Sequence, residues 1–253
     1  NRATDRSYCS SPRSTEENRM IKATYIDHMG TDLTVANAAR VSFNKTSKME
    51  HDPWGPPFLK EKDRTLIRYL ARERHISPFG HCFASFHVKA PIFVARQLVK
   101  HKFLRWNEIS RRYVDYEPEF YEPEVWRGRS ADKKQGSEGV VDLTKLDSDG
   151  NILGPDSRNK TSADWLLYEN NSGCLEIYKS KLKAGVCPEQ ARMVLPQNTI
   201  TEWMWSGSLD AFADMCRLRC ATDTQEETQK VASDINLKME DLFPVSWAAL
   251  RDD

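Results

Sequence analysis

The residues with the greatest potential for chemistry lie in one short stretch of the chain. It contains Arg96, Gln97, Lys100, His101, Lys102, Arg105, Asn107, Glu108, Ser110 and Arg112. A phosphate is bound best by cationic side chains and hydroxyl donors together, and Ser110 and Arg112 supply both from one loop. Gln97 and Glu108 could then hydrogen-bond a sugar or a base. This stretch therefore indicates a small-anion pocket, and the alternative is a solvated, salt-bridged helix end.

Two histidines and two arginines elsewhere are further candidates. His75 and His81 flank a Ser-Pro-Phe turn, but no third ligand follows at a metal-binding spacing, so we expect no metal site. By residue type alone, His75 is a packing or capping residue, and Arg192 and Arg219 are surface residues of apolar helices. HExxH, Walker, GxSxG and helix-opening GxGxxG motifs are absent from the sequence.

The elements that must position these residues are helices mixed with a few strands. Helical patterns occupy 33–43, 61–74, 90–101, 163–184, 209–220 and 225–242, and strand patterns occupy 20–29, 82–89 and 199–205. Residues 103–121 have too little periodicity for a core element and are predicted to form a loop. Because no βα unit repeats, the pattern favours an α+β fold.

Length and charge narrow the classes of function. The chain has 253 residues, and its 37 Lys and Arg balance 37 Asp and Glu, so we expect no nucleic-acid partner. The polar residues 1–20 are predicted to be a mobile N-terminal arm, and residues 21–253 a single domain. Within it, residues 127–161 are predicted to be an exposed insertion without a catalytic role, with a hairpin in 140–153 at the turn Asp149-Gly150.

Cysteine use and hydropathy predict the compartment. The six cysteines include no CxxC pair, and neither a signal-peptide pattern nor an apolar run of membrane-spanning length is present. We therefore expect a cytoplasmic protein, in the host cytoplasm if the source is viral, with no membrane association.

Five ordered segments resemble the flavin-dependent thymidylate synthases. They are AARVSF (38–43), HISPFGH (75–81), HVKAPIFVARQLVKHKFLRWNEISRRY (87–113, followed by EFYEP and Trp126-Arg127), ARMVLP (191–196) and LRCATDTQEE (218–227). The resemblance implies an α+β domain with a mainly antiparallel sheet packed with helices, and a homotetramer whose subunits jointly enclose FAD and dUMP. It further implies methylation of dUMP at C5 to dTMP, with 5,10-methylenetetrahydrofolate supplying the carbon and NADPH reducing the flavin.

The resemblance also implies roles for individual residues. Nucleotide-binding positions are matched by Gln97, Glu108, Ser110, Arg112, Arg192 and Arg219, with Arg219 facing the pyrimidine and the other arginines and Ser110 meeting phosphate. Flavin-lining positions are matched by Ser42, His75, Ser77, Lys100, His101, Lys102 and Ser208. Arg219, Ser110 and His75 are the candidate catalytic residues, and no cysteine is required to attack the base.

The sequence departs from the family's pattern on the flavin side. Lysines replace two arginines at Lys100 and Lys102, and Arg105 replaces a serine. Near the C-terminus, the family's asparagine, arginine, asparagine and histidine become Ser208, Asp210, Asp214 and Asp223. Lysine lacks the planar arginine fork, and each carboxylate repels the flavin pyrophosphate unless a cation such as Arg105 or Arg217 offsets it. We therefore hypothesise a weakened FAD site.

An altered flavin side leaves other functions open. The one-carbon unit could be captured by water, giving 5-hydroxymethylation, or the substrate could be dCMP, whose 4-amino group a carboxylate accepts. An alternative from another functional class is a catalytically silent nucleotide-binding module, which would bind nucleotide without turnover. A flavoprotein oxidoreductase would instead oxidise NADPH regardless of folate and nucleotide.

Overall fold

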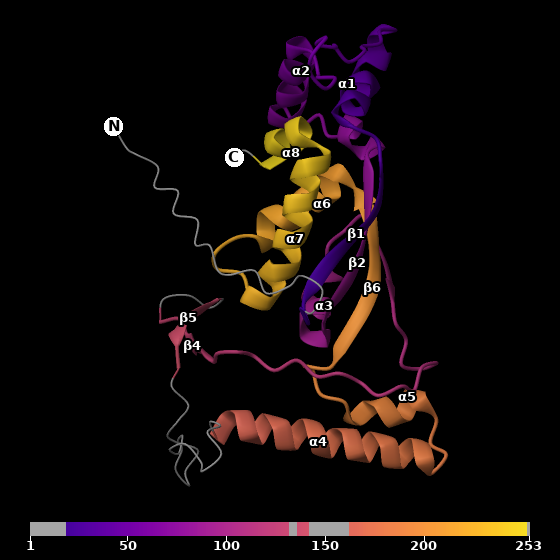
Figure 1. Cartoon of the computed structure of the whole chain (residues 1–253), viewed down its shortest axis with the longest axis vertical. Coiled ribbons are helices and arrows are strands. Elements are labelled where there is room, and N and C mark those ends of the chain that lie inside the picture. The colour runs from indigo at the N-terminus through magenta and orange to yellow at the C-terminus, as the bar shows by residue number, and fades with distance from the viewer. Residues whose placement is uncertain (1–18, 132–135, 142–161, 252–253) are drawn as a thin grey trace.

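The computed structural model describes residues 19–131, 136–141 and 162–251. A four-stranded antiparallel sheet in the order β1-β2-β6-β3 forms the centre of this part of the chain. Its strands are β1 (Lys22–Met29), β2 (Phe83–Pro91), β6 (Ile200–Ser208) and β3 (Leu104–Glu108). Helices α6 (Leu209–Arg219), α7 (Glu226–Leu242) and α8 (Pro244–Arg251) lie along one face of this sheet (Figure 1).

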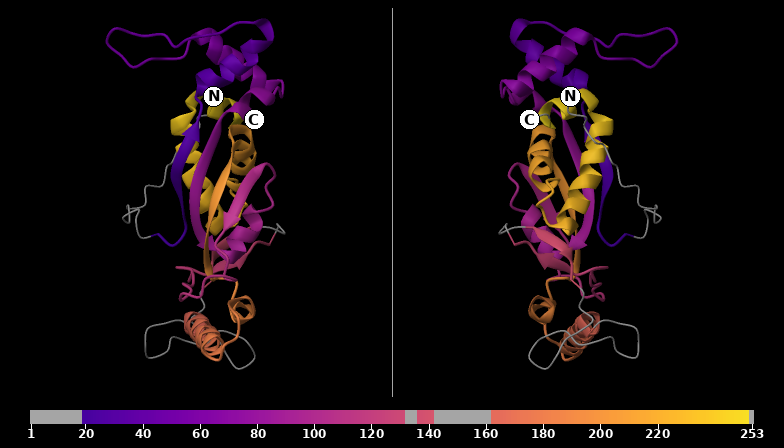
Figure 2. Two further views of the ribbon diagram at one scale, coloured as in Figure 1. Left: turned by 90° about the vertical axis from the view of Figure 1, so that its right-hand side faces the viewer. Right: turned by 90° about the vertical axis from the view of Figure 1, so that its left-hand side faces the viewer.

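The molecule is elongated, and the remaining helices lie toward its two ends (Figures 1 and 2). One end has α1 (Asp32–Arg40), the 3-10 turn η2 (Val41–Phe43), α2 (Glu61–Arg72) and the 3-10 turn η3 (Ser77–His81). The other end has α4 (Ser162–Lys183), α5 (Pro188–Ala191) and the 3-10 turn η4 (Arg192–Val194). Helix α3 (Ile92–Leu98) follows β2 directly, with Pro91 as its N-cap.

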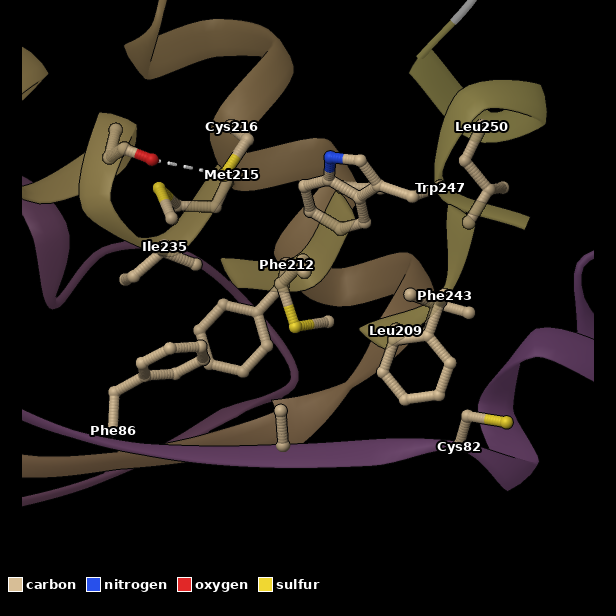
Figure 3. Packing of buried hydrophobic residues seen from close by; sticks show 14 of the residues in the cluster. Cys82, Phe86, Leu209, Phe212, Met215, Cys216, Ile235, Phe243, Trp247 and Leu250 are labelled. Carbon is tan, nitrogen blue, oxygen red and sulfur yellow. Dashed lines mark hydrogen bonds between the residues drawn. The ribbon is translucent and has the colours of Figure 1, made fainter. Parts of the chain in front are cut away.

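The core lies between the sheet and α6 and α7. Alternation in β2 turns Phe86 toward the helices, where its ring meets the ring of Phe212 edge-on at 5.3 Å (Figure 3). The register places Phe86 opposite Trp205, on the same face as Trp203. Trp106 of β3 stacks on Trp203 with ring centroids 4.3 Å apart. Burying each such side chain contributes about 1.5–3 kcal/mol, so this layer fixes β3 to the sheet.

The opposite face of the sheet is polar and open in the described part of the chain. Ser85 and Ser206 are hydrogen-bonded across the strands at 2.8 Å, and Nε2 of His87 lies 3.1 Å from Oε2 of Glu202. Exposed apolar side chains, Phe83 and Met204, lie among them. This mixed face has the composition of a surface that another subunit could cover.

Two buried carboxylates hold the α1/α2 end together. Asp63 is fully buried and accepts hydrogen bonds from Arg40 and from the Ser47 hydroxyl. Asp32 accepts the backbone N–H groups of Val245 at 3.0 Å and Ser246 at 2.8 Å, in the first turn of α8. Both carboxylates are paired, as buried charges must be. They fix α1 against α2 and α8.

The α+β prediction is confirmed, and most predicted elements are present. The predicted loop 103–121 is wrong in its first part, because residues 104–108 form β3 and pair with β6. The sequence pattern did not reveal this short strand, because Trp106 is its only strongly packed aromatic residue. Helix α8 was not predicted, since Pro244 begins this helix rather than only ending the one before it.

The predicted insertion is described only in part. Strand β4 (Arg127–Arg129) pairs with β5 (Ser137–Val140), so the insertion begins with a strand pair. The predicted hairpin in 140–153 lies almost wholly outside the described residues, as does most of the predicted arm 1–20. Arg127 itself does not belong to an exposed segment, because its side chain is only 21% exposed and is paired with two glutamates.

Candidate active site

The register of the sheet separates the predicted site residues into two groups at opposite ends of β3. At one end, Ser208 lies opposite Phe83, and Leu104 lies opposite the neighbouring Gly207. The predicted flavin-lining segments 75–77 and 100–102 lead into β2 and β3 at this end. At the other end, Glu108 lies opposite Trp203 and leads into the segment of Ser110 and Arg112.

Three predicted phosphate-binding residues gather with Glu189 in what we call the phosphate cluster: Ser110, Arg112, Glu189 and Arg192. Nε of Arg112 lies 3.3 Å from Oε2 of Glu189, and Nε of Arg192 donates to the backbone oxygen of Glu189 at 3.3 Å. The backbone N–H of Arg112 donates to the Ser110 hydroxyl oxygen at 3.3 Å. Both arginine side chains are exposed and available to an anion. The cluster therefore presents two exposed guanidinium groups and a hydroxyl, the groups expected of an anion site.

Glu108 is held where β3 ends. The hydroxyl of Thr201 donates to its Oε1 at 2.8 Å, and Nε1 of Trp106 donates to its Oε2 at 3.1 Å. Both donors come from the sheet, so the carboxylate is fixed beside the segment that leads to the phosphate cluster. An exposed, oriented carboxylate of this kind can accept hydrogen bonds from hydroxyl groups of a sugar.

A second cluster joins the end of α6 to the end of α3. Nε of Arg219 donates to Nε2 of His101 at 2.9 Å, and its Nη2 lies 3.5 Å from the backbone oxygen of Gln97. Burial and the neighbouring Arg219 lower the pKa of His101 from 6.5 to about 4, so the imidazole is neutral at physiological pH. Burial also lowers the pKa of Arg219 from its ordinary value. The structure thus brings three predicted residues together.

Gln97 has further partners on α7 that sequence reasoning missed. Its amide nitrogen donates to Oε1 of Gln225, and its Oε1 accepts from the Thr228 hydroxyl at 3.2 Å. Glu227, between them, is 3% exposed. The sequence did contain a signal for Glu227. It lies on the same helical stripe as Val231 and Ile235, where an acidic residue implies a buried partner. Glu189 could also have been found, three residues before Arg192.

The predicted flavin-lining residues are mostly exposed. Ser42, His75, Ser77, Lys100 and Lys102 are exposed, His101 is half-buried and Ser208 is buried at the start of α6. His75 contacts Tyr69 with ring centroids 5.9 Å apart. Between Lys102 and β3, Phe103 is 81% exposed and has a left-handed backbone with φ of 64°. A bulky residue rarely adopts this conformation, and such strain is typical of functional loops.

The carboxylates that depart from the family's pattern differ in their surroundings. Asp214 is paired with Arg217 at 2.7 Å, so one of the predicted offsets is in place. Oδ1 of Asp210 is buried and has no hydrogen-bond partner. Ser77, Lys100 and Lys102 have exposed hydroxyl and ammonium groups in the segments that lead into β2 and β3, and such donors suit a pyrophosphate. A carboxylate such as that of Asp210 would oppose such a ligand.

Within the described part of the chain, no hydrogen bond joins the phosphate cluster to the cluster around Arg219. We find no group of three or more potential metal ligands among residues 19–131, 136–141 and 162–251. None of the helices described is long and apolar enough to cross a membrane.

Comparisons with known proteins place this geometry in a family. The sequence model of the thymidylate synthase complementing protein family matches residues 24–245. The flavin-dependent thymidylate synthase of Thermus thermophilus is 37% identical over 227 residues, covering 90% of this chain and 74% of that protein. The enzyme of the same name from Thermosipho africanus is 35% identical over 210 residues, covering 83% and 82%.

A solved structure is similar in fold as well. It is the UMP/dUMP methylase PolB from Streptomyces cacaoi bound with 5-Br dUMP. Its TM-score is 0.69 at 28% sequence identity, and the match covers 90% of this chain and 94% of PolB. Because the family model and these relatives span most of its length, the chain belongs to the family of the flavin-dependent thymidylate synthases.

Proposed function

We propose that this protein transfers a one-carbon unit from 5,10-methylenetetrahydrofolate to C5 of dUMP and forms dTMP. The observation that supports this most directly is the pair of clusters, one suited to a phosphate and one presenting a half-buried arginine beside a neutral histidine. Family membership supports the same reaction. The substrate of the similar PolB, a UMP/dUMP methylase, is consistent with it.

The phosphate cluster would hold the 5′-phosphate of dUMP. Arg112 and Arg192 supply planar donor groups, and the Ser110 hydroxyl adds a donor beside them. The phosphate would take the place that the Glu189 carboxylate occupies beside Arg112. Glu108, oriented by Thr201, would accept a hydrogen bond from the sugar.

Arg219 would act on the pyrimidine. Its Nε is committed to His101, so the guanidinium is fixed while other N–H groups remain for a ligand. These donors would stabilise negative charge that develops on the base when a carbon unit is added at C5. Ser110 and His75 stay predicted catalytic residues. In this structure His75 is exposed and packs against Tyr69.

FAD would be held at the end of the sheet where β2 and β3 begin. Lys100, Lys102, Ser77 and Ser208 would meet its polar groups, with Ser42, His75 and His101 near them. When bound, the flavin supplies the hydride chemistry, and NADPH is the proposed reductant. The protein's own task is to hold C5 of the base close to that cofactor.

We propose a homotetramer with shared active sites. The two clusters have no direct link within the described residues of one chain, which a site built from two subunits would explain. The open sheet face, with Phe83 and Met204 exposed beside paired polar groups, provides a surface for a second copy. We also propose a cytoplasmic location, without nucleic-acid or membrane partners.

The test is tritium release from C5 of the substrate. The purified protein is incubated with FAD, NADPH and methylenetetrahydrofolate, and [5-³H]dUMP, dCMP and UMP are offered separately. We expect release from dUMP and a product with the mass of dTMP. Arg219→Ala should abolish release, whereas Arg68→Ala, at an exposed arginine paired with Glu61, should not change it.

The other outcomes separate the alternatives. Release only from dCMP, or a product heavier by a hydroxymethyl group, would establish a divergent transferase. Nucleotide binding without release would indicate a catalytically silent module. NADPH oxidation that ignores both folate and nucleotide would indicate an oxidoreductase.

A further inference from the structure

We infer that Thr228, Gln225 and Glu227 are positioning residues that fix the side-chain amide of Gln97 in one orientation for the nucleotide. With Gln97 they form what we call the Gln97 relay. This inference rests on the proposed function, because it concerns how that same site recognises its substrate. None of the three residues was a candidate from the sequence.

The relay is continuous from the substrate side to a buried charge. The Thr228 hydroxyl donates to Oε1 of Gln97 at 3.2 Å, and the Gln97 amide nitrogen donates to Oε1 of Gln225. The Gln225 side chain also lowers the pKa of the nearby Glu227 carboxylate, as expected if its NH₂ group is turned toward that carboxylate. All three α7 positions lie in or beside the first turn of that helix, so they move as one rigid unit against α3.

Glu227 is the fixed end of the relay. Its two carboxylate oxygens accept from Nη2 of Arg127 at 2.8 and 2.6 Å, and its Oε1 also accepts from the Tyr121 hydroxyl at 3.2 Å. Burial alone would raise the pKa of Glu227. The hydrogen bonds from Arg127 and Gln225 outweigh it, so the pKa lies below its ordinary value and the group is ionised.

An ionised carboxylate determines the direction of every hydrogen bond behind it. It only accepts, so Gln225 must turn its NH₂ group toward Glu227 and its oxygen toward Gln97. Gln97 must then turn its own NH₂ group toward Gln225 and its oxygen toward Thr228. A flipped Gln97 would set two amide oxygens against each other, which leaves buried acceptors unpaired.

This arrangement leaves Gln97 with a defined set of free groups. An amide has two N–H donors and two lone pairs, and the relay uses one of each. Gln97 therefore offers one donor and one acceptor, at fixed positions, to a ligand beside Arg219. Without the relay the amide could rotate and present either atom, so binding would lose both orientation and discrimination.

The relay also borders a cavity of about 460 Å³ on its far side, which Gln225, Glu227, Arg127 and Tyr121 help to line. Because Glu227 and Gln225 line this cavity, they can be substituted without disturbing a packed core. A purely structural role of the Arg127–Glu227 pair, fixing α7 to β4, is the competing explanation. The decisive variant must therefore leave that pair intact.

Thr228→Val is that variant, because it removes one hydroxyl at a fully buried position and keeps the shape. Thr199→Val is the matched control, since Thr199 is equally buried but donates to the backbone oxygen of Pro196 at 2.7 Å, not to Gln97. Thr228→Val should raise the KM for dUMP about three- to tenfold, as expected for one lost hydrogen bond, with little change in kcat. Thr228→Ser should restore the KM, and the control should not raise it.

A double-mutant cycle with Gln97→Ala gives the sharpest result. If Thr228 acts through Gln97, adding Thr228→Val to Gln97→Ala changes KM no further. An equal effect of Thr228→Val in both backgrounds would overturn the inference, and so would an unchanged KM in Thr228→Val alone.

Calorimetric titration with dUMP separates this inference from the proposed reaction. If the wild type binds dUMP but releases no tritium, the proposed reaction fails, and the same cycle is completed on dissociation constants. If the wild type does not bind dUMP, both are overturned. If it binds and reacts while the cycle shows no coupling, only the relay is wrong.

Discussion

Nε of Arg219, at the end of α6, donates a hydrogen bond to Nε2 of His101, in the loop between α3 and β3, at 2.9 Å. Because an arginine is always a donor, Nε2 must be the accepting nitrogen, and the proton of the neutral ring lies on Nδ1. The side chain expected from the family pattern to line the flavin therefore also orients the arginine expected to face the pyrimidine. This contact links the two halves of the proposed site.

The first prediction concerns pH and stability. The pKa of His101 is lowered from 6.5 to about 4 by burial and by Arg219, so between these values the unfolded chain binds more protons than the folded one. The free energy of unfolding should therefore fall as pH decreases from 6.5 toward 4. The urea concentration at the unfolding midpoint should fall less steeply with decreasing pH in His101→Asn. Asparagine can accept the hydrogen bond from Arg219 but does not titrate. Identical pH profiles would contradict the assignment.

The second prediction concerns the phosphate cluster. Glu189 competes with a ligand phosphate for Arg112, so Glu189→Gln should strengthen dUMP binding about two- to fivefold at low salt, in line with the weak coupling of exposed ion pairs. The gain should shrink as salt rises. Glu119→Gln, which removes the exposed partner of Lys89, is the control and should leave dUMP affinity unchanged. Weaker binding in Glu189→Gln would show that Glu189 supports the pocket.

The third prediction concerns the end of the molecule that includes Ser42. Removing the buried Asp63 carboxylate leaves Arg40 without its partner, and breaking such a pair costs about 3–5 kcal/mol. Asp63→Ala should lower the free energy of unfolding by that amount. Glu61→Gln, in an exposed pair with Arg68 at 3.4 Å, should change it little. Urea unfolding of both variants measures these two changes in the free energy of unfolding, and equal changes would contradict the prediction.

The fourth prediction concerns Cys220, the residue that follows Arg219. A hydrogen bond with Cys216 lowers the pKa of the Cys220 thiol from 9.0 to about 7, despite partial burial, and Arg251 contributes in the same direction. The rate of alkylation by iodoacetamide at Cys220 should therefore reach half its maximum near pH 7. Cys216→Ala, which removes the donor, should move this midpoint upward. An alkylation midpoint near pH 9 in the wild-type protein would be incompatible with an interaction between Cys216 and Cys220.

The sequence predicted the fold well where its patterns were long, and the roles of the site residues stay predictions that rest on the family pattern. Helices α2, α6 and α7 were found because their apolar residues repeat over several turns. Strand β3 was missed, because five residues with one packed tryptophan have too little alternation to detect. Its stability comes from pairing with β6, which is distant in sequence.

The partners of the candidate residues across the fold could not be predicted from the sequence. Arg112 and Arg192 were expected to act together, and the structure shows Glu189 between them. The Gln97 relay was not expected, because it depends on how α3 packs against α7. No local spacing in either segment encodes that packing. The position of Glu227 on an apolar stripe could have indicated a buried partner, but not that the partner is Arg127.

The last prediction tests whether the departures from the family weaken FAD binding. Oδ1 of Asp210 is buried without a hydrogen-bond partner, at the first turn of α6 beside Ser208, where a helix start would otherwise favour an anion. In the pose implied by the family, a carboxylate there would repel the pyrophosphate, whereas that of Asp214 is offset by Arg217. Asp210→Arg, which restores the family's residue, should therefore tighten FAD binding by about tenfold or more, given charge interactions of several kcal/mol near a protein surface.

The measurement is a fluorescence titration with FAD. Asp214→Asn is the control, and because Asp214 is already paired it should change the affinity much less. Tight FAD binding that is the same in the wild type and in Asp210→Arg would show that the carboxylate does not face the pyrophosphate. The cofactor would then lie differently from the pose implied by the family, since a carboxylate next to bound pyrophosphate weakens binding.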